Sequence, residues 1–133
     1  MAKIVIIGAG AMGTAFALPC LDNNHDINIV GTHLENDFIE ELKNNNNLHP
    51  GLNTQIPQEI KIFKFEKFEE LLKSNVDLIV LGISSKGIEW VSDQLSKLYK
   101  DHTIPKLLML TKGLSIYNNQ YELLVDKLER LLA

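Results

Sequence analysis

The sequence predicts an α/β fold in which a doubly wound, mainly parallel sheet is covered by helices on both faces. Short apolar stretches with strand character alternate with amphipathic stretches at helical spacing along all 133 residues. Ile4–Ile7 is a continuous run of branched apolar residues, as expected for a parallel strand that is buried on both faces. Alternation of this kind is typical of right-handed crossover units that build a parallel sheet.

A glycine-rich turn follows this first strand directly. Gly8, Gly10 and Gly13 give the spacing G-x-G-x-x-G, and an apolar stretch that predicts a helix comes next. In such a turn Gly8 allows the tight bend, Gly10 lets a pyrophosphate approach the backbone, and Gly13 lets the helix pack closely on the strand. The free N–H groups and the positive end of the helix dipole attract an anion. Because a strand precedes the motif and a helix follows it, we expect a Rossmann-type dinucleotide-binding turn rather than a plain loop.

The remaining elements are predicted from the same two signals. Apolar runs predict four more strands, and the strand at Ile60–Phe63 is expected at an edge because Lys61 interrupts it. Apolar residues at helical spacing predict four more helices. The stretch from Leu48 to Pro57 is expected to be a structured loop. The other predicted strands are Ile27–Val30, Val76–Leu81 and Lys106–Leu110, and the helical stripes span Leu34–Leu42, Phe65–Leu72, Ile88–Leu98 and Tyr117–Leu131.

The composition narrows the class of protein. The length suffices for one domain with a substantial core, and the net charge of -4 provides no basic stripe for a nucleic acid. No apolar run approaches the length of a membrane span, and the N-terminus has no signal-peptide pattern. The single cysteine, Cys20, cannot form an internal disulfide and is expected to be packed in the first helix, so we expect a cytoplasmic protein.

Other kinds of site find little support in the sequence. The four histidines are not at metal-ligand spacing, and with one cysteine no metal site is expected. The pair Ser84-Ser85 lacks the sharp G-x-S-x-G turn of a hydrolase nucleophile. Ligands of doubly wound sheets bind instead at the carboxyl ends of the strands. The turns expected to converge there are Gly8–Gly13, Gly31–His33, Gly82–Lys86 and Thr111–Gly113.

The end of the second strand bears on the choice of cofactor. A site for NAD usually has an acidic residue there, about 20 residues after the glycine-rich turn, which holds the ribose hydroxyls. This sequence reads Gly31-Thr32-His33, and the next acidic residue is Glu35. With no carboxylate at the strand end, nothing is expected to repel the extra phosphate of NADP. Thr32 can donate a hydrogen bond to that phosphate, and His33 is either a second contact or a solvated loop residue. The sequence therefore favours NADP slightly, with NAD as the alternative.

Four stretches resemble the N-terminal, cofactor-binding part of NAD(P)-dependent glycerol-3-phosphate dehydrogenases, particularly the archaeal type. The glycine-rich turn and its continuation to Ala15 are shared by many dehydrogenases, and Val30–Thr32 resembles the end of the second strand in this family. The two more specific matches are the loop Asn47–Leu52, with the Ile56-Pro57 that follows it, and the turn Thr111–Leu114.

The resemblance implies which residues meet the ligands. It implies cofactor contacts at Ala11, Met12 and Thr32, besides the glycines, and it implies that Lys112 meets both the nicotinamide end of the cofactor and a small phosphorylated substrate. An ammonium group there can neutralise the phosphate and polarise the oxygen atoms of the substrate. The resemblance also makes Ser85 an expected cofactor contact, because it corresponds to a serine that follows the fourth strand in the family, whereas Ser84 replaces the proline before it.

Family members continue with another strand and an all-helical substrate domain, which supplies the acid/base lysine. We therefore expect residues 1–133 to be the cofactor-binding domain alone, with the sheet truncated before it is complete and the acid/base lysine beyond Ala133. No catalytic acid or base is then expected in this chain, and without one the isolated chain should be inactive. An uncovered sheet edge and apolar helix face would also favour association into a homo-oligomer.

The activity implied by the resemblance is the interconversion of dihydroxyacetone phosphate and glycerol 3-phosphate with NAD(P)H. Two other functions remain open. Enzymes similar to ketopantoate reductase share the glycine-rich turn and carry a lysine just after the fourth strand, where this chain has Lys86. The second alternative is a non-catalytic nucleotide-binding module that reports the redox state of the cofactor.

Overall fold

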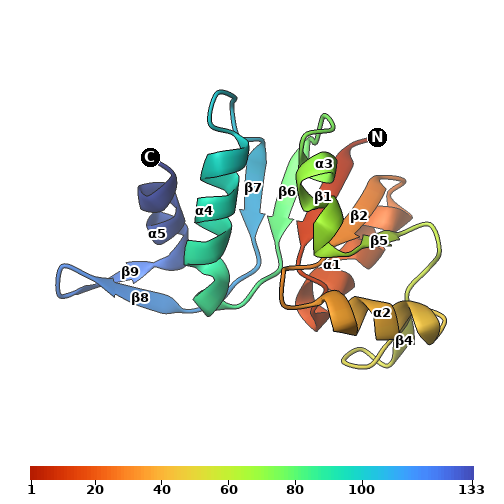
Figure 1. Cartoon of the computed structure of the whole chain (residues 1–133). Helices are drawn as coiled ribbons and strands as arrows, with labels where there is room; N and C mark the ends of the chain where they lie inside the picture. The colour runs from red at the N-terminus through yellow and green to blue at the C-terminus, as the bar shows by residue number, and fades with distance from the viewer.

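A central parallel sheet with helices on both faces dominates the computed structural model, which describes residues 1–133 (Figure 1). Each strand is short and rich in branched apolar residues, and the chain returns to the sheet through a helix after nearly every strand. The sheet strands are β1 (Lys3–Ile7), β2 (Asp26–Val30), β5 (Lys61–Phe63), β6 (Leu78–Leu81) and β7 (Lys106–Met109). The helices are α1 (Ala11–Asp22), α2 (Asn36–Asn44), α3 (Phe68–Leu72), α4 (Ile88–Leu98) and α5 (Leu124–Leu132).

The strands lie in the spatial order β5-β2-β1-β6-β7, and every neighbouring pair is parallel. This order is that of the doubly wound nucleotide-binding fold, so the predicted fold class is confirmed. The expected edge position of the third strand is also confirmed, since β5 pairs only with β2. The strand order reverses between β1 and β6, which makes the crevice at their carboxyl ends the expected place for a ligand.

Alternate residues of the strands form two cores, one on each face of the sheet. Ile4 and Ile6 of β1 contribute to a core with α1 and α2. Val5 and Ile7 contribute to the opposite core with α3, α4 and α5. Because both faces are buried, the strands read as apolar runs rather than as alternating patterns. Cys20 is half-buried in α1, and this burial raises the pKa of its thiol.

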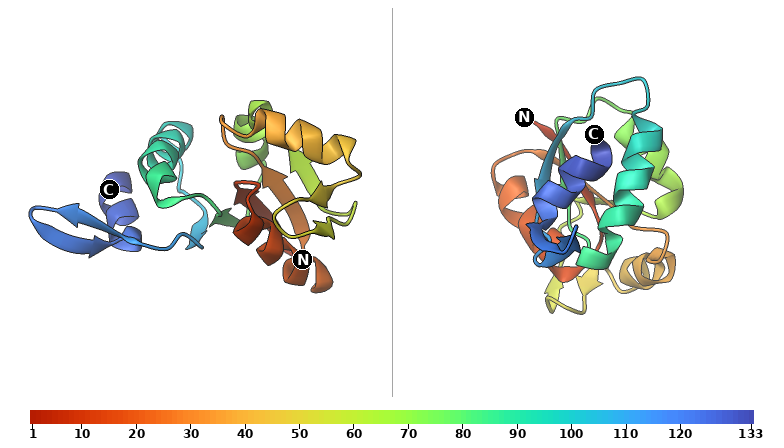
Figure 2. Two further views of the ribbon diagram at one scale, coloured as in Figure 1. Left: turned by 90° about the horizontal axis from the view of Figure 1, so that it is seen from below. Right: turned by 90° about the vertical axis from the view of Figure 1, so that its left-hand side faces the viewer.

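The C-terminal region differs from the prediction of one helix over Tyr117–Leu131. Strands β8 (Leu114–Tyr117) and β9 (Gln120–Leu123) form an antiparallel hairpin, and only then does α5 begin. Asn118 and Asn119 connect the strands with φ of 52° and 62°, the two positive values that a tight hairpin turn requires and that asparagine tolerates. The spacing of Tyr117 and Tyr121 therefore resembled a helical stripe by coincidence. The hairpin projects away from the sheet (Figure 2).

Two smaller findings concern the region between β2 and β5, of which the first differs from the prediction. Leu34 is 82% exposed and lies before α2, so it is not part of the apolar stripe predicted for that helix. The loop from Leu48 to Pro57 contains a two-stranded ribbon, β3 (Leu48–His49) with β4 (Thr54–Gln55), in agreement with a structured loop. None of the helices combines the length and the apolar character needed to cross a membrane.

Candidate functional site

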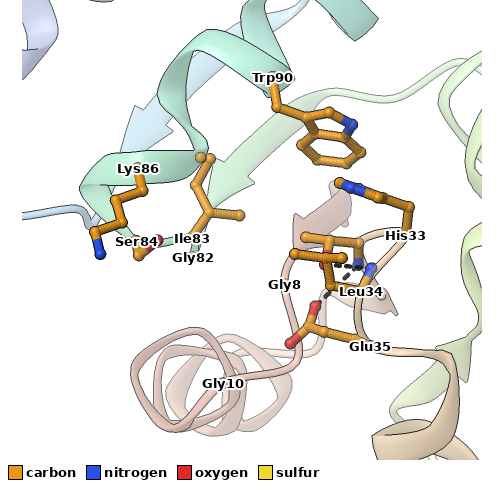
Figure 3. A pocket seen from close by; sticks show the side chains of 12 residues that line it. Gly8, Gly10, His33, Leu34, Glu35, Gly82, Ile83, Ser84, Lys86 and Trp90 are labelled. Atoms are coloured by element: carbon orange, nitrogen blue, oxygen red, sulfur yellow. Dashed lines mark hydrogen bonds between the residues drawn. The ribbon is translucent and has the colours of Figure 1, made fainter.

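The turns after β1, β2, β6 and β7 meet at the carboxyl edge of the sheet, as the sequence predicts. They enclose a cleft of about 480 Å³ and a groove of about 380 Å³ beside it. The two hollows share Gly10 and the segment 82–84, so they form one continuous depression across the glycine-rich turn. Figure 3 shows the first half of this depression, in which the His33 and Trp90 rings lie together and Lys86 lies across from them.

Three glycines at the base of the site are required by packing. Gly8 has a φ of 110°, and a Cβ atom there would collide with the carbonyl oxygen of Gly82. A Cβ at Gly82 would lie 3.0 Å from the Cα of Gly13, and a Cβ at Gly13 would lie 3.1 Å from the carbonyl oxygen of Gly8. Each of the three thus occupies the space that a side chain on another would need. This arrangement brings α1 against the switch point between β1 and β6.

Gly10 is a different case, because neither its conformation nor its neighbours require a glycine. Its φ of -69° and ψ of 176° are open to any residue, and a Cβ there would meet nothing within 4 Å. Gly10 begins α1 without a side-chain cap, and the first turn contains no acidic residue. The N–H of Gly10 has no acceptor within the chain. Free N–H groups at the positive end of a helix are able to bind an anion, and a glycine there would let the anion come close.

An aromatic group forms the outer wall of the cleft. The His33 ring lies 4.7 Å from the Trp90 ring, measured between centroids and tilted by 34°, and Phe65 lies 5.7 Å from Trp90. Thr32 lines the same cleft from the end of β2. Thr32 and His33 are identified as candidates from the sequence, whereas Trp90 is not. Its only signal there is its position beside the apolar stripe of α4, which indicates packing rather than a site.

Glu35 places a carboxylate at the end of β2, where the sequence leads us to expect none. The side chain turns back from the start of α2, and its Oε1 accepts hydrogen bonds from the N–H groups of Thr32 at 2.9 Å and Ala9 at 3.2 Å. Its Oε2 also lies 3.2 Å from the Ala9 nitrogen. The expectation that no carboxylate lies near this strand end is therefore wrong, because the side chain of Glu35, five residues after the end of β2, turns back to it. Two N–H groups compensate its charge.

The second half of the depression contains the other predicted site residues. Ser85, in the 3₁₀ turn Ser85–Gly87, and Lys112, in the turn after β7, line the groove together with Ala11 and Met12. The hydroxyl group of Thr111 donates a hydrogen bond of 2.7 Å to the Ile83 carbonyl and ties these two turns together. Lys112 is exposed and forms no ion pair within the chain, so its ammonium group is free to meet an anionic ligand.

The fold and the glycine-rich turn define the class of protein as a Rossmann-type dinucleotide-binding domain. A family model described as the N-terminus of NAD-dependent glycerol-3-phosphate dehydrogenase matches residues 3–133. The chain belongs to this family, and the resemblance noted in the sequence is confirmed. Ala133, the last residue of the match, follows directly on α5 and is exposed. The acid/base lysine expected beyond Ala133 lies outside the described residues, so its position stays a prediction.

Individual relatives agree with the family match. The chain is 30% identical over 116 residues to an NADP(+)-dependent glycerol-3-phosphate dehydrogenase of Archaeoglobus fulgidus, over 87% of this chain and 33% of the relative. It is 34% identical over 115 residues to the glycerol-3-phosphate dehydrogenase (NAD(P)+) of Fusobacterium nucleatum, over 86% of this chain and 32% of that protein. The chain thus spans about a third of the length of these relatives.

Solved structures show the same fold. The crystal structure of glycerol-3-phosphate dehydrogenase from Coxiella burnetii superposes with a TM-score of 0.77 at 24% identity, covering 98% of this chain and 38% of that one. A glycerol-3-phosphate dehydrogenase from Plasmodium falciparum gives a TM-score of 0.74 at 20% identity, with the same coverage of both chains.

Proposed function

We propose that this chain is the cofactor-binding domain of a dehydrogenase that interconverts dihydroxyacetone phosphate and glycerol 3-phosphate with NAD(P)H. The observation that carries the proposal is Gly10, a glycine that the protein itself does not need, at a helix start whose N–H groups lack partners. A closely bound pyrophosphate accounts for both features. The family match supplies the reaction, because the relatives are named for it.

The two halves of the depression suit the two ends of a dinucleotide. In this proposal the adenosine end lies in the cleft with Thr32, His33 and Trp90, whose ring offers an apolar surface for a base. The nicotinamide end lies in the groove with Met12, Ser85 and Lys112. The pyrophosphate between them lies at Gly10, which lines both halves.

When bound, the reduced nicotinamide would supply the hydride for the carbonyl carbon of the substrate, and a proton would have to reach the carbonyl oxygen to complete the alcohol. Lys112 supports this step by holding the anionic substrate near the cofactor and by stabilising negative charge on its oxygen. No carboxylate or histidine lines the groove beside Lys112. In this proposal the acid/base lysine therefore belongs to a segment beyond Ala133. The chain alone should bind cofactor without reducing dihydroxyacetone phosphate.

NADPH is the preferred cofactor in this proposal. The Thr32 hydroxyl accepts an N–H bond of 3.3 Å from Leu34, which leaves its own hydrogen free for a 2′-phosphate. The name of the Archaeoglobus relative supports the same preference. The Glu35 carboxylate opposes it, but two backbone N–H groups hold that carboxylate toward the interior of the turn.

Titration of the purified chain with NADPH and then NADH, followed by calorimetry, tests the proposal. Binding of both cofactors, tighter for NADPH, is the expected result. Binding of neither cofactor would contradict the assignment of a cofactor-binding domain. Equal affinities would contradict only the preference for NADPH. A positive control is adenosine 2′-monophosphate, which carries the base and the 2′-phosphate without the pyrophosphate.

The alternative of a ketopantoate-reductase-like enzyme is less well supported. It rests on Lys86, which lines the cleft with His33 and Trp90, whereas Lys112 lines the groove assigned to the nicotinamide. The match to the glycerol-3-phosphate dehydrogenase family also favours the first function. A non-catalytic regulatory module has no observation in its favour beyond the shared nucleotide-binding fold.

We also propose that the chain self-associates, through the outer face of the β8–β9 hairpin. Four apolar side chains share this face, all between 57% and 78% exposed, and none carries a charge: Leu114, Ile116, Tyr121 and Leu123. The hairpin is a separate two-stranded sheet, so each strand has a free edge. A second hairpin is complementary to both the apolar face and the free edge, because each copy presents the same surface.

A further inference from the structure

His49 is a buried titratable side chain behind the glycine-rich turn, and the proposed hydride transfer makes no use of it. The residue is 2% exposed and lies in β3, where its ring packs edge-on against Phe38 of α2 with 5.4 Å between centroids. The site cleft and groove do not include it. A histidine buried to this degree requires a partner for each ring nitrogen.

The partners of the two nitrogens determine where the proton lies. The N–H of Gly51 donates to Nδ1 over 3.1 Å, so Nδ1 must present its lone pair. In the neutral ring the hydrogen is then on Nε2. Nε2 lies 2.9 Å from the carbonyl oxygen of Ala9 and donates to it. One side of the ring is thus fixed by its own loop, and the other holds the glycine-rich turn.

Ala9 is held at both ends of its backbone. Its N–H donates to the Glu35 carboxylate at 3.2 Å. Its carbonyl accepts from His49 Nε2 at 2.9 Å and, over a longer 3.4 Å, from the Thr14 hydroxyl, so His49 is the closer of its two donors. Ala9 is 1% exposed, and no peptide bond in the chain is cis. In a trans peptide the carbonyl and the following N–H point in opposite directions. Because the Ala9 carbonyl turns inward to His49, the Gly10 N–H turns outward, and it has no acceptor within the chain.

We propose that His49 is a positioning residue for the cofactor. By holding the Ala9 carbonyl it sets the orientation of the Ala9–Gly10 peptide, and so presents the Gly10 N–H to the pyrophosphate. His49 itself touches no part of the ligand. This inference rests on the proposed function, since it concerns the same pyrophosphate site.

Two substitutions separate the two hydrogen bonds of His49. In His49→Gln the side-chain amide reaches the position of Nε2 and can still donate to the Ala9 carbonyl. In His49→Asn the oxygen of the shorter amide replaces Nδ1 and can still accept from Gly51, but the side chain no longer reaches the Ala9 carbonyl, which keeps only the 3.4 Å bond from the Thr14 hydroxyl. If positioning is the role, His49→Asn weakens NADPH binding about tenfold, the effect of one hydrogen bond to a charged group. His49→Gln keeps affinity close to that of the unmodified chain.

Binding of adenosine 2′-monophosphate distinguishes a positioning role from a general loss of structure, because a general loss would weaken its binding as well. It lacks a pyrophosphate, so its affinity should be the same in the unmodified chain and in both variants. An equal loss for NADPH and for adenosine 2′-monophosphate in His49→Asn would overturn the proposal, as would an unchanged NADPH affinity. If His49→Gln lowers the NADPH affinity as much as His49→Asn does, the hydrogen bond to Ala9 does not account for the effect and the proposal is wrong.

A measurement on the unmodified chain keeps the proposal testable even if a variant fails to fold. The ¹⁵N chemical shifts of the His49 ring should show a proton on Nε2 and none on Nδ1. A proton on Nδ1 would overturn the proposal directly. Failure of the unmodified chain to bind NADPH or NADH would instead refute the proposed function, so the two failures are distinguishable.

Discussion

At the scale of single residues, Gly10 is a glycine that no contact within the chain requires, so a substitution there tests the proposed ligand contact separately from folding. Gly8, Gly13 and Gly82 are fixed by contacts within the chain, whereas a side chain at Gly10 meets only open space. We predict that Gly10→Ala lowers NADPH affinity about tenfold or more, because the methyl group prevents close approach of the pyrophosphate. The free energy of unfolding should stay within about 1 kcal/mol, since the backbone conformation suits alanine. Calorimetric titration and urea denaturation give the two quantities.

The matched control is Gly8→Ala, which adds the same methyl group two residues earlier. Here φ is 110° and the added Cβ collides with the Gly82 carbonyl, so the unfolding free energy should fall by several kcal/mol. If Gly10→Ala instead destabilises the chain as much as Gly8→Ala, the glycine is structural and its assignment to the pyrophosphate is wrong.

Thr32 carries the second prediction at this scale. Thr32→Val keeps the shape of the side chain and removes the hydroxyl that is free to donate to a 2′-phosphate. NADPH affinity should fall about tenfold while NADH affinity stays the same. Thr32→Ser, which keeps the hydroxyl, serves as the control. A parallel loss for both cofactors would show that Thr32 supports the end of β2 rather than recognising the phosphate.

The sequence predicts the residues of the site that lie on strand ends, and it misses those that reach it from elsewhere. Gly8, Gly10 and Thr32 follow directly from the position of β1 and β2. Glu35 and His49 do not, because their side chains cross from other segments to the backbone of Ala9. Local spacing contains no information about such long-range hydrogen bonds. The residues that lead to His49, a run of four asparagines and the start of a loop, give no sequence signal that His49 lies beside the glycine-rich turn.

At the scale of elements, the hairpin and α5 are joined by one charged pair. Arg130 of α5 donates to Glu122 of β9 and stacks over the Tyr117 ring at 3.7 Å from its centroid. Ser115 also donates to Glu122, over 3.0 Å. The hydrogen bond from Arg130 is the main reason why the pKa of Glu122 lies below its usual value, and the Ser115 bond adds to the effect. The polar face of the hairpin thus points toward the helix, and the apolar face points outward.

This pair predicts a pH dependence of the hairpin. A carboxyl whose pKa is lowered on folding stabilises the folded state above its unfolded pKa of about 4.3 and loses that effect as the pH falls through the folded value. The amide NMR shifts of the hairpin should therefore remain native at pH 5 and change only in more acidic solution. In Glu122→Gln the hairpin should lack this transition. A transition of equal size in the variant would assign the effect to another carboxyl group.

The hairpin also shows that a pair of strands can carry apolar residues at helical spacing. Tyr117, Tyr121 and Leu124 recur at helical spacing, but the intervening Asn118-Asn119 is a turn signal. Strand propensity of the tyrosines and Ile116 agrees with the turn and not with the helix. The five strands of the central sheet carried no such conflict, because their apolar runs lie between clear turns. In the central sheet the apolar pattern and the turn residues indicate the same strands, and the prediction of five strands is confirmed.

At the scale of the whole molecule, the proposed self-association places the outward apolar face of the hairpin between two copies of the chain. We predict that the unmodified chain forms dimers or larger species at micromolar concentration in sedimentation velocity. Ile116→Thr combined with Tyr121→Thr keeps strand propensity and removes the apolar contact, so this variant should sediment as a monomer. Gln120→Thr, on the opposite face of β9, should leave association unchanged. A monomeric unmodified chain over the whole concentration range would contradict the proposal.

The contact among Gly8, Gly13 and Gly82 has a further consequence for how this domain can vary. The missing side chain of each is replaced by the backbone of the next, in a closed cycle of three. A methyl group added at one of these glycines must move β1, α1 and the turn after β6 apart. A second methyl group then has part of the space that it needs. The cost of a double alanine substitution should therefore be smaller than the sum of the two single costs. In mutational terms the three positions behave as a single locus, although they lie up to 74 residues apart in the chain.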